Sequence, residues 1–374
     1  MKIGLVVPHI FMQQRLLPHI IFSPGTQALQ LAEGLGRLGT DVTLFSPGPV
    51  HTAVRNVTAD LTLFEQELAG RGDDYTDLLK KHPFTFITLA RQVQSEVIAK
   101  AYAMANSGEL DIVHIYTNEE DIALPFAQFC RQPVVFTHHD PFNFLVRYKN
   151  IFPKYSHLNW LSMSFAQRGG MPADTTWVGN IYHGLEPARF VPNYQPSGDY
   201  VAYLGRIVEP KGVHVAIAAA KQAGVKLKIA GKHYAGHRKD TYWQTQILPY
   251  VDGRAVEYAG HLRGGAELQD FLGNARGVLV PSTFEEPFGM VVIEALACGT
   301  PVIGLRSGAI PEIVEDGKTG FVVDKEDAIQ DMAMAIGAIK RVDRRDCRRA
   351  FEERFTLERM CGEHLTVYRK LTGL

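Results

Sequence analysis

The feature that most constrains the fold of this chain is a regular alternation of short, wholly apolar runs with segments of helical period. Apolar runs in the first half are Lys2–Pro8, Asp41–Ser46, Asp111–Tyr116, Pro133–His138 and Leu161–Ser164. Helical patterns such as Gln27–Leu38 and Glu119–Cys130 lie between them. Runs that are apolar throughout are typical of strands buried on both faces. Strand–helix–strand alternation therefore predicts an α/β fold with parallel, doubly wound sheets.

The alternation is interrupted at residues 183–200, HGLEPARFVPNYQPSGDY, where three prolines and two glycines fall without a period. We expect the interdomain linker there, since 374 residues exceed one ordinary hydrophobic core. A second set of strands and helices follows: Tyr200–Leu204, Lys226–Ala230, Ala255–Ala259, Gly277–Val280 and Pro301–Gly304 as strands, and Val213–Ala223, Ala266–Leu272, Met290–Cys298 and Asp327–Ile339 as helices. The chain is thus expected to form two Rossmann-like domains that face each other, with ligands in the cleft at the carboxyl ends of both sheets.

The end of the chain predicts one more helix. Apolar side chains recur at three- to four-residue spacing through the tail, at Met360, Leu365, Tyr368 and Leu371. We therefore divide the chain into an N-terminal domain over residues 1–188, a C-terminal domain over residues 189–354 and a terminal helix over residues 355–374.

Composition excludes several classes of protein. Hydrophobic residues make up 46% and charged residues 21%, as in soluble globular proteins. A net charge of -1 argues against general binding to nucleic acid, although it allows a local basic groove. The four cysteines contain no C-x-x-C pair, which excludes a disulfide scaffold or a zinc site and favours a reducing cytosol. No run approaches the roughly 20 apolar residues of a membrane span, so we expect a cytoplasmic protein with at most peripheral membrane contact.

The stretch Pro281–Pro301, PSTFEEPFGMVVIEALACGTP, is the most informative for function. It predicts a loop after a strand, a helix that begins near Met290, and a helix end at Gly299. A loop that enters a helix directly presents unpaired N–H groups and the positive end of the helix dipole, which suits an anion. Gly289 removes a side chain where a ligand would approach the backbone.

Two carboxylates accompany this predicted anion site. Glu286 precedes the helix and Glu294 lies about one turn inside it, so both can face one ligand. A carboxylate suits a vicinal diol because its two oxygens accept from adjacent hydroxyls. Either residue alone would be interpreted as a solvated surface charge. Together they favour a ligand with a phosphate between two polyols, the shape of a nucleotide sugar.

A second signal is Gly205–Gly212, GRIVEPKG, which follows a predicted strand and precedes a predicted helix. Arg206 offers a planar fork for phosphate oxygens and Lys211 a point charge. An ordinary exposed turn is an equally good interpretation of this segment by itself. The glutamate pair on the same half of the chain favours a pyrophosphate site instead.

The run from about Tyr200 to Val323 resembles the nucleotide-binding half of the retaining family 4 glycosyltransferases, which have the GT-B fold. The matching segments are G-R-x-x-x-x-K-G at 205–212, P-S at 281–282, E-P-F-G at 286–289 with the second Glu at 294, A-C-G-T-P-V-I at 297–303, and G-A-I-P-E-I-V-E-D-G-K-T-G-F at 308–321. Together they are highly specific for that family, and they cover about a third of the chain.

The resemblance implies roles for particular residues of the C-terminal domain. Arg206 and Lys211 would hold the donor pyrophosphate, Glu286 the sugar hydroxyls and Glu294 the ribose hydroxyls. The backbone N–H groups of Phe288, Gly289, Met290 and Val291 would meet sugar and phosphate. The resemblance also implies that the terminal helix crosses back to the N-terminal domain, and that this domain binds the acceptor.

The first half resembles the family more loosely. Pro24-Gly25-Thr26 stands where the family has a Gly-Gly pair, so only Gly25 is carried over, as a backbone contact near the diphosphate. His114, at a strand end, is interpreted as a structural residue. Phe136–Asp140 resembles the strand-end histidine placed beside donor sugar and acceptor, and His139 is preferred over its neighbour His138, which remains the alternative.

The resemblance implies retaining transfer of a hexose from a nucleotide diphosphate sugar, with a UDP-sugar expected, to an unidentified small-molecule, glycan or lipid-linked acceptor. The chain has no D-x-D sequence, so we predict metal-independent transfer without a cofactor. Front-face attack is favoured, with Glu286 and His139 as catalytic residues; covalent catalysis by Glu286 is the alternative. A two-lobed nucleotide-sugar-binding protein or an epimerase-type enzyme also stays open, whereas the signatures of a phosphorylase and of a dinucleotide oxidoreductase are absent.

Two basic stretches remain. Asn143–Trp160 mixes Arg147, Lys149 and Lys154 with aromatic residues, which fits a membrane-interface or lipid-acceptor surface. A connecting helix and loop that lines the acceptor cleft is the favoured alternative. Lys340–Arg349 holds five arginines with two aspartates, and is expected to form a solvated helix face.

Overall fold

The structure, a computed structural model, describes residues 1–13, 22–72, 75–116, 120–233 and 240–374. The chain divides into two compact units. Unit 1 contains Met1–Met163, Arg168–Ile181 and Met360–Leu374, and unit 2 contains Ser164–Gln167 and Tyr182–Arg359. The chain therefore enters unit 2 briefly at Ser164–Gln167, passes to it again between Ile181 and Tyr182, and returns to unit 1 inside the terminal helix α12 (Leu357–Thr372).

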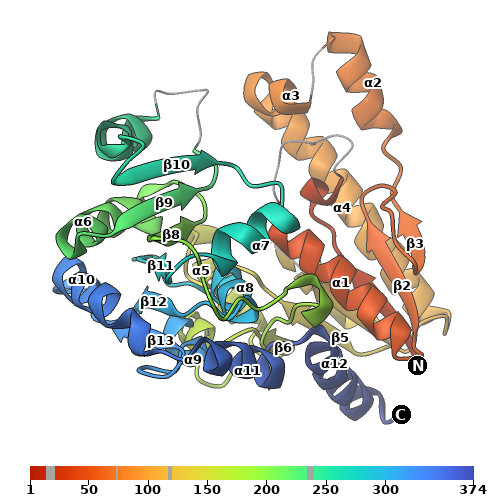
Figure 1. The fold of residues 1–374 in the computed structure, drawn as a ribbon. Coiled ribbons are helices and arrows are strands. Elements are labelled where there is room, and N and C mark those ends of the chain that lie inside the picture. Colours follow the sequence, from red (N-terminus) through yellow and green to blue (C-terminus); the bar gives the residue numbers. More distant parts are fainter. Residues whose placement is uncertain (14–21, 73–74, 117–119, 234–239) are drawn as a thin grey trace. The chain divides into compact units, whose positions relative to one another are not determined.

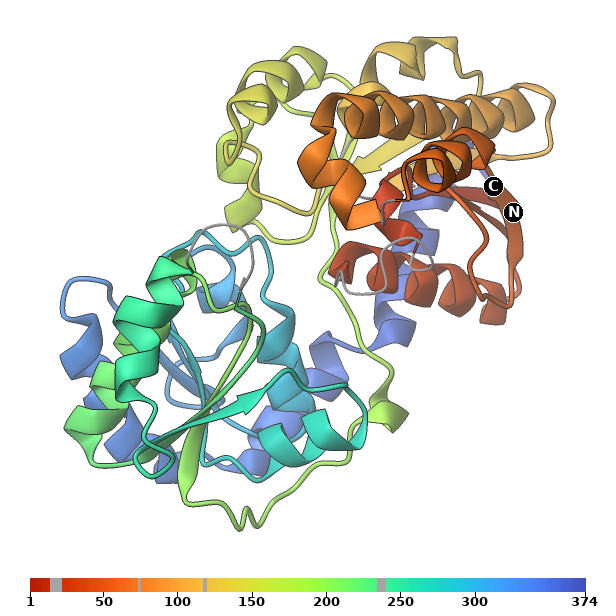
Figure 2. The same ribbon diagram turned by 90° about the horizontal axis from the view of Figure 1, so that it is seen from above.

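Unit 1 is built on a seven-stranded sheet in the order β3-β2-β1-β4-β5-β6-β7, in which every pairing is parallel. Its strands are β1 (Lys2–Val6), β2 (Asp41–Ser46), β3 (Arg55–Thr58), β4 (Ile112–Tyr116), β5 (Val134–Thr137), β6 (Asn159–Ser162) and β7 (Trp177–Asn180). The helices are α1 (Ser23–Arg37), α2 (Thr62–Arg71), α3 (Tyr75–Lys81), α4 (Pro83–Asn106) and α5 (Val146–Ile151), and most of α12 joins them. In Figures 1 and 2 the two chain ends lie side by side within this unit.

Unit 2 has a six-stranded parallel sheet in the order β10-β9-β8-β11-β12-β13. Its strands are β8 (Tyr200–Leu204), β9 (Lys226–Ala230), β10 (Val256–Gly260), β11 (Val278–Val280), β12 (Val302–Leu305) and β13 (Gly320–Val323). Figure 1 shows α6 (Val213–Ala223) and α10 (Ala328–Ala338) on one face of the sheet, and α7 (Ala266–Gly273), α8 (Met290–Ala297) and α11 (Arg344–Arg354) on the other. A short helix, α9 (Ile310–Ile313), follows β12.

The cores follow from the apolar runs in the sequence. In unit 1, β4 and β5 contribute Val113, Ile115 and Phe136 to a cluster with Val97 and Ala101 of α4. In unit 2, residues of β8 and β9 pack with those of α6 and α10 in the same way. The α/β architecture with two parallel sheets is confirmed. Because all strands of each sheet are parallel, their carboxyl ends meet at one edge, where ligands are expected.

One predicted helix is wrong. Residues 120–130 form two 3₁₀ segments, Glu120–Ile122 and Leu124–Phe129, instead of the α-helix expected over Glu119–Cys130. The local bonds run over three residues, from Phe126 N to Ala123 O and from Cys130 N to Ala127 O, each 3.1 Å long. Pro125 in this turn has no N–H to donate, which weakens an α-helical ladder. Glu119 itself lies outside the described residues.

Candidate functional site

The segment between β8 and α6 carries the two predicted cations. Glu209–Lys211 forms a 3₁₀ turn, and Gly212 ends it with φ 69°. The Tyr203 hydroxyl donates to the Arg206 carbonyl oxygen over 2.9 Å and so fixes the start of the turn. A Cβ on Gly212 would lie 2.0 Å from the Pro281 carbonyl oxygen. Both the backbone angle and the close approach therefore require glycine at this position.

The acidic loop after β11 is bonded directly to that turn. The backbone N–H groups of Thr283 and Phe284 donate to the Pro210 carbonyl oxygen over 3.0 and 3.2 Å. The Ser282 hydroxyl lies 3.3 Å from the same oxygen. Cations and acids thus lie on two loops that share one backbone hydrogen-bond acceptor, which holds them in a fixed relative position.

Residues 307–309 support the acidic loop from the next strand. Ala309 N donates to the Glu286 carbonyl oxygen over 2.8 Å, and the Ser307 hydroxyl donates to Phe284 O over 2.8 Å. Gly308 has φ 52°, and a Cβ there would lie 2.2 Å from Glu286 O. The G-A-I-P segment at 308–311 is therefore explained as the support of the loop that carries Glu286.

A cavity of about 170 Å³ opens between these two loops at the carboxyl ends of β8 and β11. Six of the ten predicted site residues line it: Arg206, Lys211, Glu286, Gly289, Met290 and Val291. Phe288 does not line it. The Phe288 side chain is 2% exposed and its ring centroid lies 5.0 Å from that of His183, so this ring belongs to the core of unit 2.

Within the cavity Lys211 and Glu286 form an ion pair. Lys211 Nζ donates to Glu286 Oε1 over 2.5 Å. The side chains are 19% and 10% exposed, so this pair is largely shielded from water. Because an unpaired charge in such a place is costly, each group stabilises the other before any ligand arrives. Arg206, at the rim, is exposed.

The start of α8 forms the floor of the cavity. Gly289 is its N-cap, with φ 98° and ψ 71°, and no side chain caps the helix. The first N–H groups of a helix have no acceptor inside the helix. Here they belong to residues that line the cavity, where the positive end of the helix dipole adds to the two cations. Glycine is favoured at 289 because φ 98° is a backbone angle that other residues rarely adopt.

Glu294 lies inside α8 and is not among the residues that line this cavity. Burial raises the pKa of its carboxyl to about 7, and the Arg189 guanidinium acts in the opposite direction. The group can therefore change its charge near pH 7 when a partner approaches.

The other two predicted site residues lie in unit 1. Gly25 lines a cavity of about 210 Å³ between the loop after β1, the start of α1 and the loop after β2. A Cβ on Gly25 would lie 2.7 Å from Met12 Sδ and from a ring carbon of Phe22. His139 follows β5, and its ring centroid lies 4.8 Å from that of Tyr116.

Two other histidines, His138 and His114, are buried inside unit 1. His138 is fully buried, with the rings of Tyr148 and Phe152 at 4.5 and 4.8 Å. His114 is bonded through Nδ1 to Tyr368 Oη over 2.6 Å and through Nε2 to Thr137 Oγ1 over 2.8 Å. Burial lowers its pKa well below the usual value. His114 is thus a neutral, fully bonded core residue, as the sequence analysis favoured.

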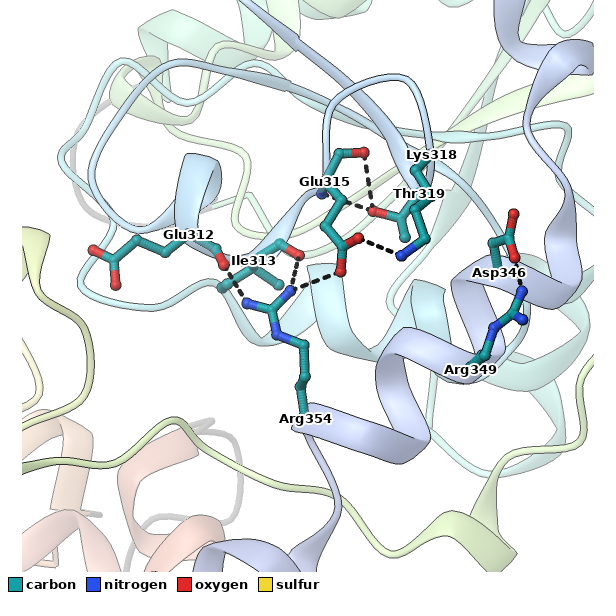
Figure 3. Close-up of polar contacts among 8 residues, drawn as sticks. All are labelled: Glu312, Ile313, Glu315, Lys318, Thr319, Asp346, Arg349 and Arg354. Carbon is teal, nitrogen blue, oxygen red and sulfur yellow. Dashed lines mark hydrogen bonds and ion pairs between the residues drawn. The ribbon is translucent and has the colours of Figure 1, made fainter.

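Sequence reasoning missed the residues that brace the site from a distance. Figure 3 shows Arg354 of α11, whose guanidinium donates to the carbonyl oxygens of Glu312 and Ile313 and pairs with the Glu315 carboxylate. Glu315 also accepts from Lys318 Nζ over 2.7 Å. The charged end of the 308–321 segment is therefore a structural clamp. No local pattern reveals it, because its arginine comes from another helix.

The expectation that Lys340–Arg349 forms a solvated helix face is wrong for Arg344, which is buried. Arg344 is 8% exposed and donates to the carbonyl oxygens of Gly273 and Ala275 and to Thr300 Oγ1. With the bond from its Nε to Asn193 O, its guanidinium satisfies three carbonyl groups inside unit 2.

Across the described ranges, no three His, Cys, Asp or Glu side chains are grouped so that they could hold a metal ion. No helix in the described part of the chain has the length and apolar character needed to cross a membrane.

Comparison with known proteins places this geometry in context. Residues 186–354 match the family described as Glycosyl transferases group 1. The chain is 35% identical over 169 residues to a glycogen synthase of Mycobacterium tuberculosis, covering 42% of this chain and 39% of that protein. It is 24% identical over 363 residues to a phosphatidyl-myo-inositol mannosyltransferase of Mycolicibacterium smegmatis, covering 91% and 85% of the two chains.

Solved structures show the same fold at low sequence identity. Anabaena Alr3699/HepE in complex with UDP and glucose superposes with a TM-score of 0.69 at 18% identity, covering 99% of this chain and 100% of that one. The GT-B class expected from the sequence is confirmed at the level of fold. The chain spans about two fifths of the length of the relative that it matches at 35% identity.

Proposed function

We propose that this chain is a group 1 glycosyl transferase, the family that its residues 186–354 match, and that it transfers a sugar from a nucleotide diphosphate sugar to an acceptor hydroxyl. One observation carries the proposal. Arg206, Lys211, Glu286 and the open start of α8 line one cavity, inside the segment that matches the family. The combination of two cations, helix N–H groups and a carboxylate suits a diphosphate attached to a sugar.

Diphosphate binding would use the existing ion pair. The Lys211 ammonium has three donors, so it can keep its bond to Glu286 and still donate to a phosphate oxygen. Arg206 is exposed at the rim and can place its fork on the same group. The two cations then stabilise the charge that grows on the leaving diphosphate as the glycosidic bond breaks.

Glu286 has a second oxygen for the hydroxyls of the transferred sugar. In the proposed front-face reaction, the acceptor oxygen attacks the anomeric carbon on the face from which the diphosphate leaves. The acceptor proton passes to the leaving phosphate oxygen, and the configuration is retained. His139 is proposed to act next to the transferred sugar, and Gly25 to offer its backbone to the diphosphate.

Glu294 is proposed to bind the ribose hydroxyls as a carboxylate. Its pKa of about 7 means that the apo protein holds a partial proton there. Hydroxyl donors favour the charged form, so donor binding near pH 7 is expected to release a proton. The number of protons released is measured by calorimetry in buffers of different ionisation enthalpy.

The donor is proposed to be a UDP-hexose, which the complex of Alr3699/HepE with UDP and glucose supports by analogy of fold. The acceptor is proposed to be a small molecule, a glycan or a lipid-linked sugar. Transfer is proposed to need neither a metal nor a cofactor. Loss of turnover in EDTA that Mg²⁺ or Mn²⁺ restores would contradict the metal-independent mechanism.

A thermal-shift series with UDP-, GDP- and ADP-sugars tests the function. The preferred donor should raise the melting temperature by mass action, and Glu294→Ala should reduce that shift. Glu286→Ala should slow transfer more than it weakens binding. If a sugar nucleotide is bound but its sugar is never transferred to any acceptor preparation, a two-lobed binding protein becomes the better account, or an epimerase where the sugar nucleotide is converted without an acceptor.

A further inference from the structure

A stretch that the proposed function leaves unused, most of it in unit 1, is strongly basic. From Pro141 to Ala173 the chain has Arg147, Lys149, Lys154 and Arg168 and no acidic residue. Two of these cations are engaged within the unit. Arg168 donates to Ser162 Oγ and Gly179 O, and Arg147 lies 3.9 Å from Asp121.

The two lysines remain in solvent. Lys149 and Lys154 are exposed, and neither forms an ion pair with an acidic side chain of the described residues. They lie on and just after α5, a short helix whose first residue is Val146. Positive charge is therefore concentrated on α5 and in the turn that follows it.

Three consecutive apolar side chains lie next to these lysines. Phe144, Leu145 and Val146 are 53%, 40% and 81% exposed. Consecutive large apolar side chains in water carry a free-energy cost and often mark an interaction surface. We call Phe144, Leu145, Val146, Lys149 and Lys154 the α5 surface.

The α5 surface is held on a rigid base. Phe142, Tyr148 and Phe152, which alternate with its residues, are almost fully buried. Tyr148 and Phe152 stack with ring centroids 5.0 Å apart, and Phe142 packs edge-on against Phe152 at 5.5 Å. Because these rings fix the backbone, the exposed apolar side chains cannot turn into the core without unpacking it.

We propose that the α5 surface binds a membrane that contains anionic lipids. The apolar side chains would enter the boundary between headgroups and acyl chains, and the lysines would meet lipid phosphates. A second copy of the chain fits less well as the occupant. A twofold contact through this surface would bring the lysines of both copies together, and like charges oppose such pairing.

Co-sedimentation of the full chain with vesicles tests the proposal. We expect binding to vesicles of phosphatidylcholine with phosphatidylglycerol, weak binding to phosphatidylcholine alone, and loss of binding at high salt. The double variant Lys149→Gln/Lys154→Gln should weaken binding roughly 30-fold, because each lysine near a membrane surface is worth about fivefold. Phe144→Ser/Val146→Ser should weaken it at least about tenfold.

Matched controls come from unit 2. Val191 is 68% exposed, and Lys340 is exposed, so Val191→Ser and Lys340→Gln make similar surface changes elsewhere. Circular dichroism confirms that all variants are folded. Vesicle binding that the controls lower as much as the α5 variants do would overturn the proposal. So would the absence of vesicle binding, including the case in which α5 variants instead change self-association or the KM for acceptor. Donor binding is measured separately, so failure here leaves the proposed transfer reaction standing.

Discussion

The two cavities, one in each unit, are built in different ways. In unit 2, backbone contacts behind the cavity fix the two loops that line it: Pro210 O joins the loops, and glycines at 212 and 308 approach carbonyl oxygens more closely than any side chain allows. The cavity in unit 1 is enclosed by side chains, among them Phe11, Met12 and Phe22. A site made of backbone keeps its shape when surface residues change, whereas a site made of side chains adapts through single substitutions. This difference suits a constant diphosphate in unit 2 and a variable partner in unit 1.

The strongest test of the comparison adds one methyl group to the loop support beside the cavity of unit 2 and one to the lining of the cavity of unit 1. Gly212→Ala would push a Cβ to 2.0 Å from the Pro281 carbonyl oxygen, at φ 69°. Gly25→Ala meets the end of the flexible Met12 side chain and the Phe22 ring, both at 2.7 Å. We expect Gly212→Ala to abolish donor binding and to cost more than about 3 kcal/mol of stability, and Gly25→Ala to cost roughly 1 kcal/mol.

Chemical denaturation and a donor-binding assay measure both changes. Gly224→Ala is the control for backbone strain alone, because Gly224 has φ 65° and no atom within 4 Å of its Cβ position. Equal losses for Gly212→Ala and Gly224→Ala would show that the close approach to Pro281 does not matter.

The ion pair in unit 2 gives the next largest effect. Lys211→Met leaves the Glu286 carboxylate buried without its cation, so we expect a loss of roughly 3 kcal/mol in stability and at least about a hundredfold in kcat/KM. The double variant Lys211→Met/Glu286→Gln should recover stability and remain inactive. Recovery of activity together with stability would mean that the pair is only structural.

The adjacent histidines of unit 1 sharpen the comparison at the level of single side chains. His138→Ala removes a fully buried ring from the aromatic core, so we expect a loss of about 2–4 kcal/mol in the free energy of unfolding. His139→Ala should leave stability within about 1 kcal/mol and lower kcat about a hundredfold. Denaturant titration and steady-state kinetics on both variants separate the roles. If His138→Ala instead lowers kcat and His139→Ala lowers stability, the functional role belongs to His138.

The smallest expected effect concerns the pH dependence of stability through Glu294. In the folded protein its carboxyl keeps a proton up to about pH 7, whereas the ordinary pKa is 4.5. The folded state therefore binds more protons between these values, and the free energy of unfolding falls as pH rises from about 4.5 to 7. Glu294→Gln cannot lose a proton, so it should be more stable than wild type at pH 8, by roughly 1–3 kcal/mol.

Below pH 4.5 that difference should disappear, because the carboxyl is then protonated in both states. Denaturant titrations at several pH values measure it, with the exposed Glu326→Gln as the control. A constant difference between Glu294→Gln and wild type across this range would contradict the raised pKa.

The fold was predictable where strands are buried on both faces. β8 and β9 have the bounds expected from their apolar runs, and so does helix α6. The strands that were missed, β3, β7 and β13, all lie at sheet edges. Their residues are mostly half-buried. β3 (RNVT) and β7 (WVGN) lack the continuous apolar run that marks a central strand, whereas β13 (GFVV) has a short apolar run that was not assigned to a strand.

The site was predictable where chemistry is local in sequence. Charge marks the cations Arg206 and Lys211, and a glycine with a helix start marks the loop at 286–291. Both segments contribute to the lining of one cavity. The bond between Lys211 and Glu286 was not foreseen, because the two residues are 75 positions apart and no local pattern links them. Arg344 and Arg354 were missed for the same reason, since their acceptors are carbonyl groups on other elements.

The central claim is that the cavity of unit 2 holds the diphosphate of the donor, and titration calorimetry with UDP and with uridine tests it most directly. Wild type should bind UDP far more tightly than uridine. Arg206→Gln should weaken UDP binding at least about tenfold and leave uridine binding unchanged, because we assign Arg206 to the phosphates alone. Equal affinity of wild type and Arg206→Gln for UDP would contradict the account.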